Sequence, residues 1–181
     1  MSEVSSPTVE VMQRAQGIAL LCLDVDGVLT DGKLYVLSDG VEAKTFHIRD
    51  GLGLKMLMTG GVKTAIITGR KSASAQARAK ELGLDYFFEG VENKLRVVKD
   101  LMATLSIAAQ AVAFMGDDLP DLASLRACGL AVTVADAPDI MKRNAHFVTR
   151  GRGGDGAVRE VCELILQAKD LLQSQLETYR Q

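Results

Sequence analysis

Polar residues that could act together on a phosphate group stand in four short motifs of this 181-residue chain. The motifs are, in order, Asp-Val-Asp-Gly-Val-Leu-Thr at 24–30, Ile-Thr-Gly-Arg at 67–70, Lys94, and Gly-Asp-Asp-Leu-Pro-Asp at 116–121. They contribute carboxylates, a hydroxyl and an ammonium group. If the fold brings these groups to one point, they form the set that a metal-bound phosphate requires.

A phosphate monoester is a dianion, and this charge decides which residues are needed. An attacking carboxylate at ~4 Å meets roughly 8 kcal/mol of repulsion at an effective dielectric constant near 20. A divalent cation must offset that repulsion, and Asp24 and Asp117 offer the hard oxygen ligands that Mg²⁺ prefers. Lys94 can neutralise a phosphate oxygen, while Thr68 and the backbone amides after it can donate hydrogen bonds. The pair Asp24 and Asp26 alone would predict little, because D-x-D-G also occurs in calcium loops and plain turns, so it is the ordered set that favours phosphate chemistry.

Apolar runs alternate with amphipathic stretches along the chain, and three of the four motifs directly follow such a run. Because the runs are continuous, they predict strands that are covered on both faces, as in a parallel sheet. Strands that alternate with helices predict an α/β fold with a doubly wound, mostly parallel sheet. In such sheets the chemistry gathers beyond the carboxyl ends of the strands, where Asp24, Thr68 and Asp117 fall. The predicted strands are 18–23, 63–67, 86–88, 111–115, 130–134 and 146–149, and the predicted helices between them are 50–59, 72–82, 93–105, 118–127 and 137–143.

Three segments depart from this alternation. Residues 33–47 flank Asp39-Gly40, which predicts an inserted β-hairpin with a two-residue turn. Residues 157–179 carry an apolar stripe at helical spacing, which predicts one long C-terminal helix that packs on the core or contacts another subunit. Residues 1–16 are expected to form a short leading helix or arm. The whole chain, 1–181, is predicted to be one domain.

The composition argues against several classes of function. The net charge of −2, with no basic face or tail, argues against binding to nucleic acid or to an anionic membrane. Cys22, Cys128 and Cys162 are odd in number and lie in apolar neighbourhoods, so we expect reduced core cysteines rather than disulfides or a zinc site. No signal peptide and no membrane-spanning segment is recognised, and a cytoplasmic location is expected.

The order and content of the four motifs resemble those of the haloacid dehalogenase superfamily of magnesium-dependent phosphatases. The resemblance implies that Asp24 is the nucleophile, which forms an aspartyl-phosphate. It implies that Asp26 protonates the leaving oxygen and then activates water, with its backbone carbonyl on Mg²⁺. It further implies that Thr68 and Lys94 bind the transferring phosphoryl group and that Asp117 ligates the metal.

Two further carboxylates of the fourth motif have roles that the sequence leaves open. One of Asp118 and Asp121 is expected to support a metal ligand through a hydrogen bond. The other is expected to begin a helix, where the helix dipole favours a negative charge.

Two rival interpretations fail on the arrangement of the motifs. Receiver domains of signalling relays combine similar groups, but their acidic pair comes first and their lysine last. The Gly-x-Gly-x-x-Gly at 151–156 lacks the following strand and the acidic residue that a dinucleotide site needs. It is interpreted as a flexible connector, or as a mobile segment that reaches an active site of its own or a neighbouring subunit.

The spacing of the motifs narrows the subclass. The intervals from Asp26 to Thr68 and from Thr68 to Lys94 are too short for an inserted cap domain. A capless site needs other walls to exclude water, and a symmetric oligomer can supply them. The opening D-V-D-G-V-L-T-D-G, the hairpin, F-H-I-R-D-G-L-G and G-A-V-R-E-V-C-E-L-I-L together resemble one capless branch over residues 18–172.

That branch implies a substrate and an assembly. The substrate would be 3-deoxy-D-manno-octulosonate 8-phosphate, a precursor in lipopolysaccharide synthesis, with a nine-carbon sugar acid 9-phosphate as the alternative. The assembly would be a homotetramer whose hairpins pack together. A non-catalytic scaffold subunit and a phosphotransferase or phosphomutase are the alternative functions.

The sugar acid would carry a carboxylate besides its phosphate, so we expect further cationic groups around the site. Arg78 and Lys55 could also be solvated charges on helix faces, and His47 could be a hydrogen-bonded residue at a strand end. The residues that the resemblance implies in substrate binding are His47, Arg49, Asp50, Gly51, Lys55, Gly69, Arg70 and Arg78.

Overall fold

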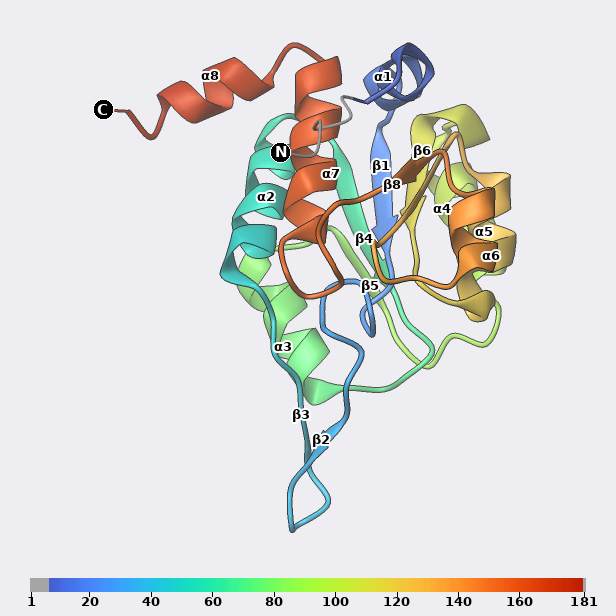
Figure 1. The fold of residues 1–181 in the computed structure, drawn as a ribbon, viewed down its shortest axis with the longest axis vertical. Helices are drawn as coiled ribbons and strands as arrows, with labels where there is room; N and C mark the ends of the chain where they lie inside the picture. Colours follow the sequence, from blue (N-terminus) through green and yellow to red (C-terminus); the bar gives the residue numbers. More distant parts are fainter. Residues whose placement is uncertain (1–6, 181) are drawn as a thin grey trace.

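A six-stranded parallel sheet forms the centre of the molecule, which a computed structural model describes over residues 7–180 (Figure 1). The strand order is β5-β4-β1-β6-β7-β8, and every neighbouring pair is parallel. The apolar runs of the four inner strands are buried as predicted, whereas the edge strands β5 and β8 are only partly buried. The predicted α/β fold class is confirmed. The strands are β1 Leu20–Leu23, β4 Lys63–Ile67, β5 Tyr86–Phe88, β6 Val112–Met115, β7 Leu130–Thr133 and β8 Phe147–Val148.

Helices cover both faces of this sheet (Figure 1). Helices α2, α3 and α7 lie on one face, and α4, α5 and α6 lie on the other. The short leading helix α1 packs against α7, whereas the rest of the predicted arm, residues 1–6, lies outside the described residues. The helices are α1 Val9–Gln16, α2 Ile48–Thr59, α3 Ala73–Leu82, α4 Lys94–Leu105, α5 Leu122–Ala127, α6 Asp139–Asn144, α7 Ala157–Ala168 and α8 Leu172–Glu177, with 3₁₀ turns η1 Ala109–Ala111 and η2 Leu119–Asp121.

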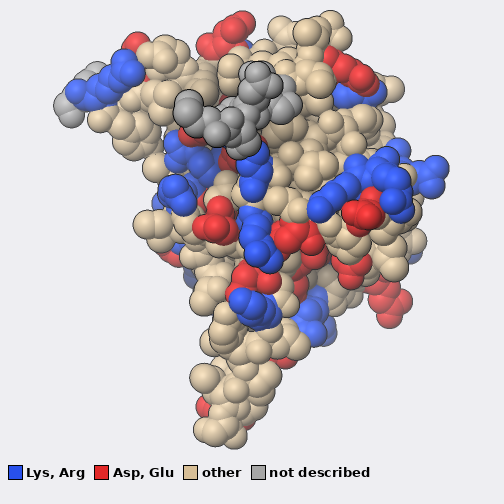
Figure 2. Space-filling model, viewed as in Figure 1, with Lys and Arg blue, Asp and Glu red and all other residues tan. Residues whose placement is uncertain are grey.

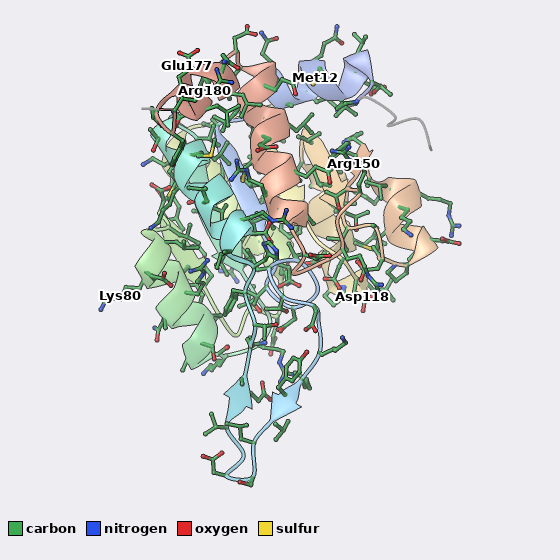
Figure 3. The ribbon with its side chains drawn as sticks, turned by 60° about the vertical axis from the view of Figure 1, so that its left-hand side comes forward. Met12, Lys80, Asp118, Arg150, Glu177 and Arg180 are labelled. Carbon is green, nitrogen blue, oxygen red and sulfur yellow. The ribbon has the colours of Figure 1, made fainter. Side chains whose placement is uncertain are left out.

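Local side-chain caps explain where several helices begin and end. Asn93 precedes α4, and its Oδ1 accepts a hydrogen bond from the backbone N–H of Arg96 at 3.0 Å. Ser72 caps α3 in the same way, and α3 ends at Gly83, whose φ of 73° is the left-handed conformation that glycine adopts readily. Lys80 in the last turn of α3 points away from the sheet into solvent (Figure 3). These caps fix the loops that enter and leave the sheet edge.

The strands after β1 are added on one side of it, and the strands from β6 onward are added on its other side. After β1 it crosses over through α2 to β4 on one side, and after β6 it crosses through α5 to β7 on the other. Helices α2 and α5 cover opposite faces, so a crevice opens between the carboxyl ends of β1 and β6. Asp24 directly follows β1, and its N–H donates to the carbonyl oxygen of Met115 at the end of β6 at 3.0 Å. This backbone pairing places the first and fourth motifs side by side.

The inserted hairpin is present, but its turn differs from the prediction. Strands β2 Tyr35–Val36 and β3 Glu42–Ala43 pair antiparallel, with Val36 opposite Glu42. Leu37 then pairs with Val41, so the loop holds three residues, Ser38 to Gly40, rather than two. The Gly40 N–H donates to the Leu37 carbonyl at 2.9 Å, and Gly40 has a φ of 82°. This is a turn followed by a left-handed residue, the usual three-residue hairpin loop.

The prediction of one long C-terminal helix is wrong. Helix α7 ends at Ala168, and α8 leaves at an angle to it (Figure 1). Asp170 stands between them with a φ of 59°, and the Leu171 N–H donates to the Leu166 carbonyl at 2.8 Å. A left-handed residue followed by such a bond closes a helix end, and aspartate tolerates this conformation better than most residues. The apolar stripe therefore divides into a buried part on α7 and a half-buried part on α8.

The structure shows the state of the three cysteines and the character of the helices. Cys22, Cys128 and Cys162 are free and buried, as predicted. Burial raises the pKa of the Cys128 thiol to about 12, so it stays protonated at neutral pH. Within residues 7–180, none of the helices combines the length and the apolar character needed to cross a membrane.

Candidate active site

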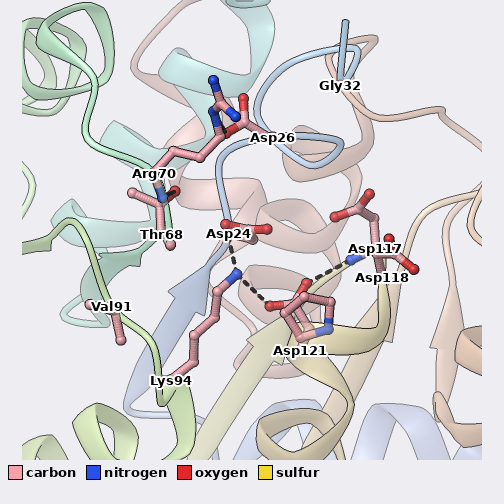
Figure 4. Close-up of a pocket in the computed structure, with 12 residues that line it drawn as sticks. Asp24, Asp26, Gly32, Thr68, Arg70, Val91, Lys94, Asp117, Asp118 and Asp121 are labelled. Atoms are coloured by element: carbon pink, nitrogen blue, oxygen red, sulfur yellow. Dashed lines mark hydrogen bonds and ion pairs between the residues drawn. The ribbon is translucent and has the colours of Figure 1, made fainter.

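A pocket of about 320 Å³ opens at the carboxyl edge of the sheet (Figure 4). All four predicted motifs contribute to its walls. The loops after β1, β4 and β6 supply one side each, and the start of α4 supplies the floor. The pocket is lined by Asp24, Asp26, Gly32, Thr68, Gly69, Arg70, Val91, Lys94, Asp117, Asp118, Pro120 and Asp121.

The Lys94 ammonium holds two carboxylates together at the floor of the pocket (Figure 4). Its Nζ lies 2.9 Å from Asp24 Oδ1 and 2.6 Å from Asp121 Oδ1, and all three side chains are buried. Burial alone would lower the pKa of Lys94, but the two carboxylates outweigh that effect and raise it. Lys94 therefore stays charged, and it is fixed where it can meet a phosphate oxygen next to Asp24.

Three carboxylates converge at one point of the pocket. One oxygen each of Asp24, Asp117 and Asp121 lies within 4.8 Å of the others. Burial and mutual repulsion raise the pKa of Asp24 to about 6 and the pKa of Asp117 to about 7. Burial likewise raises the pKa of Asp121. Such a cluster is electrostatically unfavourable when ionised, and a divalent cation between the oxygens would relieve the repulsion.

Glycine at two positions allows the acidic residues to approach so closely. A Cβ on Gly27 would lie 2.0 Å from Asp117 Oδ2, and Gly27 also has a φ of 86°. A Cβ on Gly116 would lie 2.4 Å from the Cβ of Asp121. The loop after β1 is held in shape by Thr30, whose Oγ1 accepts a hydrogen bond from the Gly27 N–H and donates one to the Val25 carbonyl. Both glycines are thus required by close approach, and Gly27 is also favoured by its left-handed backbone conformation.

Thr68 occupies the position that the sequence predicts for a phosphate donor. It directly follows β4, is buried and lines the pocket. Its N–H donates to the Phe88 carbonyl at 2.9 Å, and its carbonyl accepts from the Val91 N–H at 3.0 Å. Its Oγ1 accepts from the Arg70 N–H at 3.3 Å, which leaves the hydroxyl hydrogen free to turn into the pocket.

Asp26 lies at the mouth of the pocket between two cations. Its Oδ1 accepts a hydrogen bond from Lys44 Nζ, and its Oδ2 lies 3.9 Å from Arg70 Nε. Arg70 also reaches Glu42 Oε1 at 2.6 Å. Glu42 and Lys44 lie where the second strand of the hairpin returns to the body of the molecule. Neither residue was predicted to be part of the site. Glu42 lies on β3 and Lys44 one residue beyond its end. Their spacing of two could have shown that they share one face of the hairpin, but not that this face meets the mouth of the pocket.

The two carboxylates of the fourth motif whose roles the sequence leaves open, Asp118 and Asp121, have different surroundings in the structure. Asp118 caps the turn η2 because its Oδ1 accepts from the Leu119 N–H at 2.8 Å. Its carboxylate lies at the outer surface of the molecule (Figure 3). Asp121 binds Lys94 Nζ at 2.6 Å, and its Oδ2 accepts a hydrogen bond from the Asp117 N–H at 3.2 Å. The backbone of Asp117 is therefore tied to the same group that holds Lys94.

Among the predicted substrate-binding residues, Gly69 and Arg70 line the pocket, and the others lie outside its walls. His47 caps α2 through Nδ1, and its Nε2 lies 3.4 Å from the Arg49 guanidinium. Lys55 is exposed on α2. Arg78 pairs with a neighbouring glutamate on α3 and packs against Gly51. A role of these residues in substrate binding stays a prediction.

Asp50 has a structural environment that the sequence analysis did not foresee. Its carboxyl is buried beneath the first turn of α7, and Oδ1 accepts from the Arg159 N–H at 2.8 Å. Gly156, the residue before α7, has no side chain to cap the helix, so Asp50 supplies the cap from α2. Burial raises the pKa of this carboxyl. In this fold Asp50 links two helices and does not line the pocket.

The glycine-rich segment 151–156 is packed rather than loose. The Gly154 N–H donates to the Val28 carbonyl at 3.0 Å, and a Cβ on Gly153 would lie 1.8 Å from the Gly27 carbonyl oxygen. The segment therefore lies directly on the loop that carries Asp24 and Asp26. These contacts need the close backbone-to-backbone approach that glycine allows, and whether the segment moves stays a prediction.

The sequence of this chain is similar to those of known phosphatases. A family model for haloacid dehalogenase-like hydrolases matches residues 88–161. The 3-deoxy-D-manno-octulosonate 8-phosphate phosphatase KdsC of Yersinia pestis is 46% identical over 164 residues, which are 91% of this chain and 88% of that protein. The chain belongs to the 3-deoxy-D-manno-octulosonate 8-phosphate phosphatase family. The predicted resemblance to the haloacid dehalogenase superfamily is thereby confirmed.

Solved structures of this phosphatase family have the same fold. The Moraxella catarrhalis enzyme, in complex with a magnesium ion, a phosphate ion and 3-deoxy-D-manno-octulosonate, has a TM-score of 0.92 and 42% identity. The similarity covers 94% of this chain and 98% of that one. A probable YrbI family phosphatase of Pseudomonas syringae has a TM-score of 0.94 and 49% identity, covering 96% and 99%. The four motifs thus stand in a fold that is shared over nearly the whole length.

Proposed function

We propose that this chain is a magnesium-dependent phosphatase that hydrolyses 3-deoxy-D-manno-octulosonate 8-phosphate. The observation that carries the proposal is the meeting of Asp24, Asp117 and Asp121 around Lys94 at the switch point of the sheet. Its support comes from the Yersinia pestis phosphatase, with 46% identity over 164 residues, and from the Moraxella catarrhalis structure that holds magnesium and phosphate.

The residues present fit a magnesium ion. Hard carboxylate oxygens converge within 4.8 Å, and burial together with mutual repulsion raises the pKa values of Asp24 and Asp117. A cation between the oxygens would relieve the repulsion. Asp24 and Asp117 would hold the ion through side-chain oxygens, and Asp26 through its backbone carbonyl. The bound ion would neutralise the phosphate and allow a carboxylate to approach it.

Each residue of the site then has its own role in the reaction. Asp24 Oδ attacks phosphorus, the bond from phosphorus to the sugar oxygen breaks, and an aspartyl-phosphate forms. Asp26 gives its proton to the departing sugar oxygen. It then takes a proton from the water that attacks the aspartyl-phosphate, which releases phosphate and restores Asp24. Thr68 and Lys94 bind the non-bridging oxygens in both steps.

The charges around the mouth fit a substrate with a second anionic group. Arg70 lines the pocket and is nearly half exposed, so its guanidinium can turn from Glu42 to a sugar carboxylate. A nine-carbon sugar acid 9-phosphate is the second candidate substrate, because the same contacts would serve a longer chain. We place the activity in lipopolysaccharide synthesis in the cytoplasm, as the family's substrate implies.

The proposal includes self-association through the hairpin. The hairpin extends beyond the body of the molecule, and its tip carries few charged groups (Figure 2). Its apolar side chains are exposed, Val36 by 64% and Leu37 by 53%. A contiguous exposed apolar surface of this kind marks a protein contact. We propose that hairpins of several copies pack together, as in a homotetramer.

A panel of phosphate esters, assayed with Mg²⁺ and with a chelator, tests the function. Phosphate release should be fastest from 3-deoxy-D-manno-octulosonate 8-phosphate, should stop with chelator and should return with added Mg²⁺. Preference for a nine-carbon substrate would favour the second candidate. Absence of turnover with every ester would support a non-catalytic scaffold, and transfer to a sugar hydroxyl instead of water would indicate a phosphotransferase or phosphomutase.

A further inference from the structure

A buried ammonium from the hairpin contacts the carboxyl that is proposed to move protons. The side chain of Lys44 is only 2% exposed, although it leaves the hairpin just after β3. Its Nζ donates to Asp26 Oδ1, and this is the contact that explains its burial. An ammonium is rarely enclosed to this degree unless a partner offsets the lost hydration. Lys44 and Asp26 therefore form a built pair at the mouth of the pocket.

The other cation next to Asp26 is less able to fix it. Arg70 Nε lies 3.9 Å from Asp26 Oδ2, and its side chain is 45% exposed. Its shorter contact, at 2.6 Å, goes to Glu42 Oε1. Arg70 is thus paired with Glu42 and partly exposed, whereas the Lys44 side chain is enclosed. The position of the Asp26 carboxyl depends mainly on Lys44.

We propose that Lys44 is a positioning residue, which holds the Asp26 carboxyl on the leaving-group side of the pocket for proton transfer. The inference rests on the proposed function, because it assigns a partner to the acid–base residue of that reaction. A proton donor works only within hydrogen-bond reach of the oxygen that leaves. Because Lys44 belongs to the hairpin, the acid–base residue is held from an element outside the sheet.

Three phosphate esters separate this role from direct substrate binding. The first is 3-deoxy-D-manno-octulosonate 8-phosphate, an alkyl ester with a carboxylate. The second is ribose 5-phosphate, an alkyl ester without one, and the third is p-nitrophenyl phosphate, whose phenolate leaves without a proton. The ratio kcat/KM reports the steps up to departure of the leaving group, so a loss of proton donation should affect only the alkyl esters.

For Lys44→Met we expect kcat/KM to fall by about 10- to 100-fold with both alkyl esters and by less than about threefold with the aryl ester. In an Asp26→Asn background the same change should alter kcat/KM for the alkyl esters by less than about threefold, because residues that act as one unit are not additive. Lys44→Arg, which keeps the positive charge, should lower kcat/KM for the alkyl esters less than Lys44→Met does. Lys33→Met is the control, since Lys33 is an exposed lysine of the same hairpin.

Three results would overturn the inference. A loss confined to the sugar acid would make Lys44 a contact of the substrate carboxylate. An equal loss with all three esters would make its role structural, as would full additivity with Asp26→Asn. If Lys44→Met fails to fold by circular dichroism, Lys44→Gln, which keeps a hydrogen-bond donor, is judged by the same criteria. Lack of turnover by the unmodified enzyme would instead reject the proposed function.

Discussion

At the scale of single residues, charge balance is the main feature of the pocket. The Lys94 ammonium binds Asp24 and Asp121, whereas burial and the charges of these two carboxylates raise the pKa of Asp117 to about 7. The pKa of this carboxyl is higher in the folded protein than its unfolded value of 3.8. The charged form is therefore less favourable in the folded state than in the unfolded state. Its ionisation therefore lowers stability as the pH rises from 3.8 through about 7.

The metal should reverse this loss of stability. We expect the free energy of unfolding of the metal-free protein to fall between pH 4 and pH 7, and Mg²⁺ to raise Tm more at pH 8 than at pH 5, because it binds ionised carboxylates. In the metal-free protein at pH 8, Asp117→Asn should raise Tm by roughly 2–4 °C, since it removes a buried charge. It should also abolish the increase in Tm with Mg²⁺. Differential scanning calorimetry with and without Mg²⁺ measures both effects.

Asp100→Asn is the matched control for this prediction. Asp100 is an exposed carboxylate on α4. Its replacement should leave the pH dependence and the response to Mg²⁺ unchanged. A full Mg²⁺ response in Asp117→Asn would show that Asp117 is not a metal ligand.

At the scale of elements, the loop after β1 depends on close packing by other loops. Gly27 lies close to Asp117 from the loop after β6, and Gly153 of the glycine-rich segment 151–156 packs against the Gly27 carbonyl. Three loops from distant parts of the sequence are thus stacked at the carboxyl edge of the sheet. The position of the metal ligands depends on this stack.

Gly27→Ala tests the stack. The new Cβ would lie 2.0 Å from Asp117 Oδ2 and would force the two loops apart. We expect phosphatase activity to fall about 100-fold or more, because a shift of about 1 Å at a reacting group is that costly. Gly61→Ala is the control: Gly61 has a φ of 84° but no neighbouring atom within 4 Å of a Cβ. It should lose about 1–2 kcal/mol of stability and retain its activity. Equal activities of the two variants would contradict this account.

Elements governed by local rules were predictable from the sequence. The strands follow from continuous apolar runs, and the start of α4 follows from Asn93 as a cap. The end of α7 was not predictable, because Asp170 carries no strong local signal for a left-handed residue. The three-residue hairpin loop was missed because Asp39-Gly40 also suits the shorter turn.

The site was predictable only where its residues follow the ends of strands. Asp24, Thr68 and Asp117 come directly after β1, β4 and β6, so the topology alone brings them together. Lys44 reaches the pocket from an inserted hairpin, and no rule of sheet topology places it. Asp50 was expected at the substrate, but it caps α7 across 109 residues of sequence, a tertiary contact that no local pattern reveals.

At the scale of the whole molecule, the hairpin stands apart from the compact body (Figure 1). An isolated two-stranded hairpin is marginally stable in water, so its exposed apolar residues call for a partner. The same element carries Lys44 and Glu42 toward the pocket. Assembly and catalysis are therefore expected to be coupled through the hairpin.

Polar substitutions at the hairpin tip test the assembly. We expect the unmodified protein to sediment as a tetramer and the double variant Val36→Ser, Leu37→Ser to sediment as smaller species with lower activity, because the apolar contact is lost. Val9→Ser, at an even more exposed apolar residue of α1, should not change the sedimentation. A fully active monomer, observed by analytical ultracentrifugation at the assay concentration, would contradict the coupling.

We propose that Asp24 is the nucleophile of a magnesium-dependent phosphatase. The most direct measurement is phosphate release from 3-deoxy-D-manno-octulosonate 8-phosphate by the unmodified enzyme and by Asp24→Asn, side by side at saturating Mg²⁺. We predict a loss of about 1000-fold or more in kcat, because an amide cannot form the aspartyl-phosphate. Phosphate release by Asp24→Asn within tenfold of the unmodified rate would contradict the account.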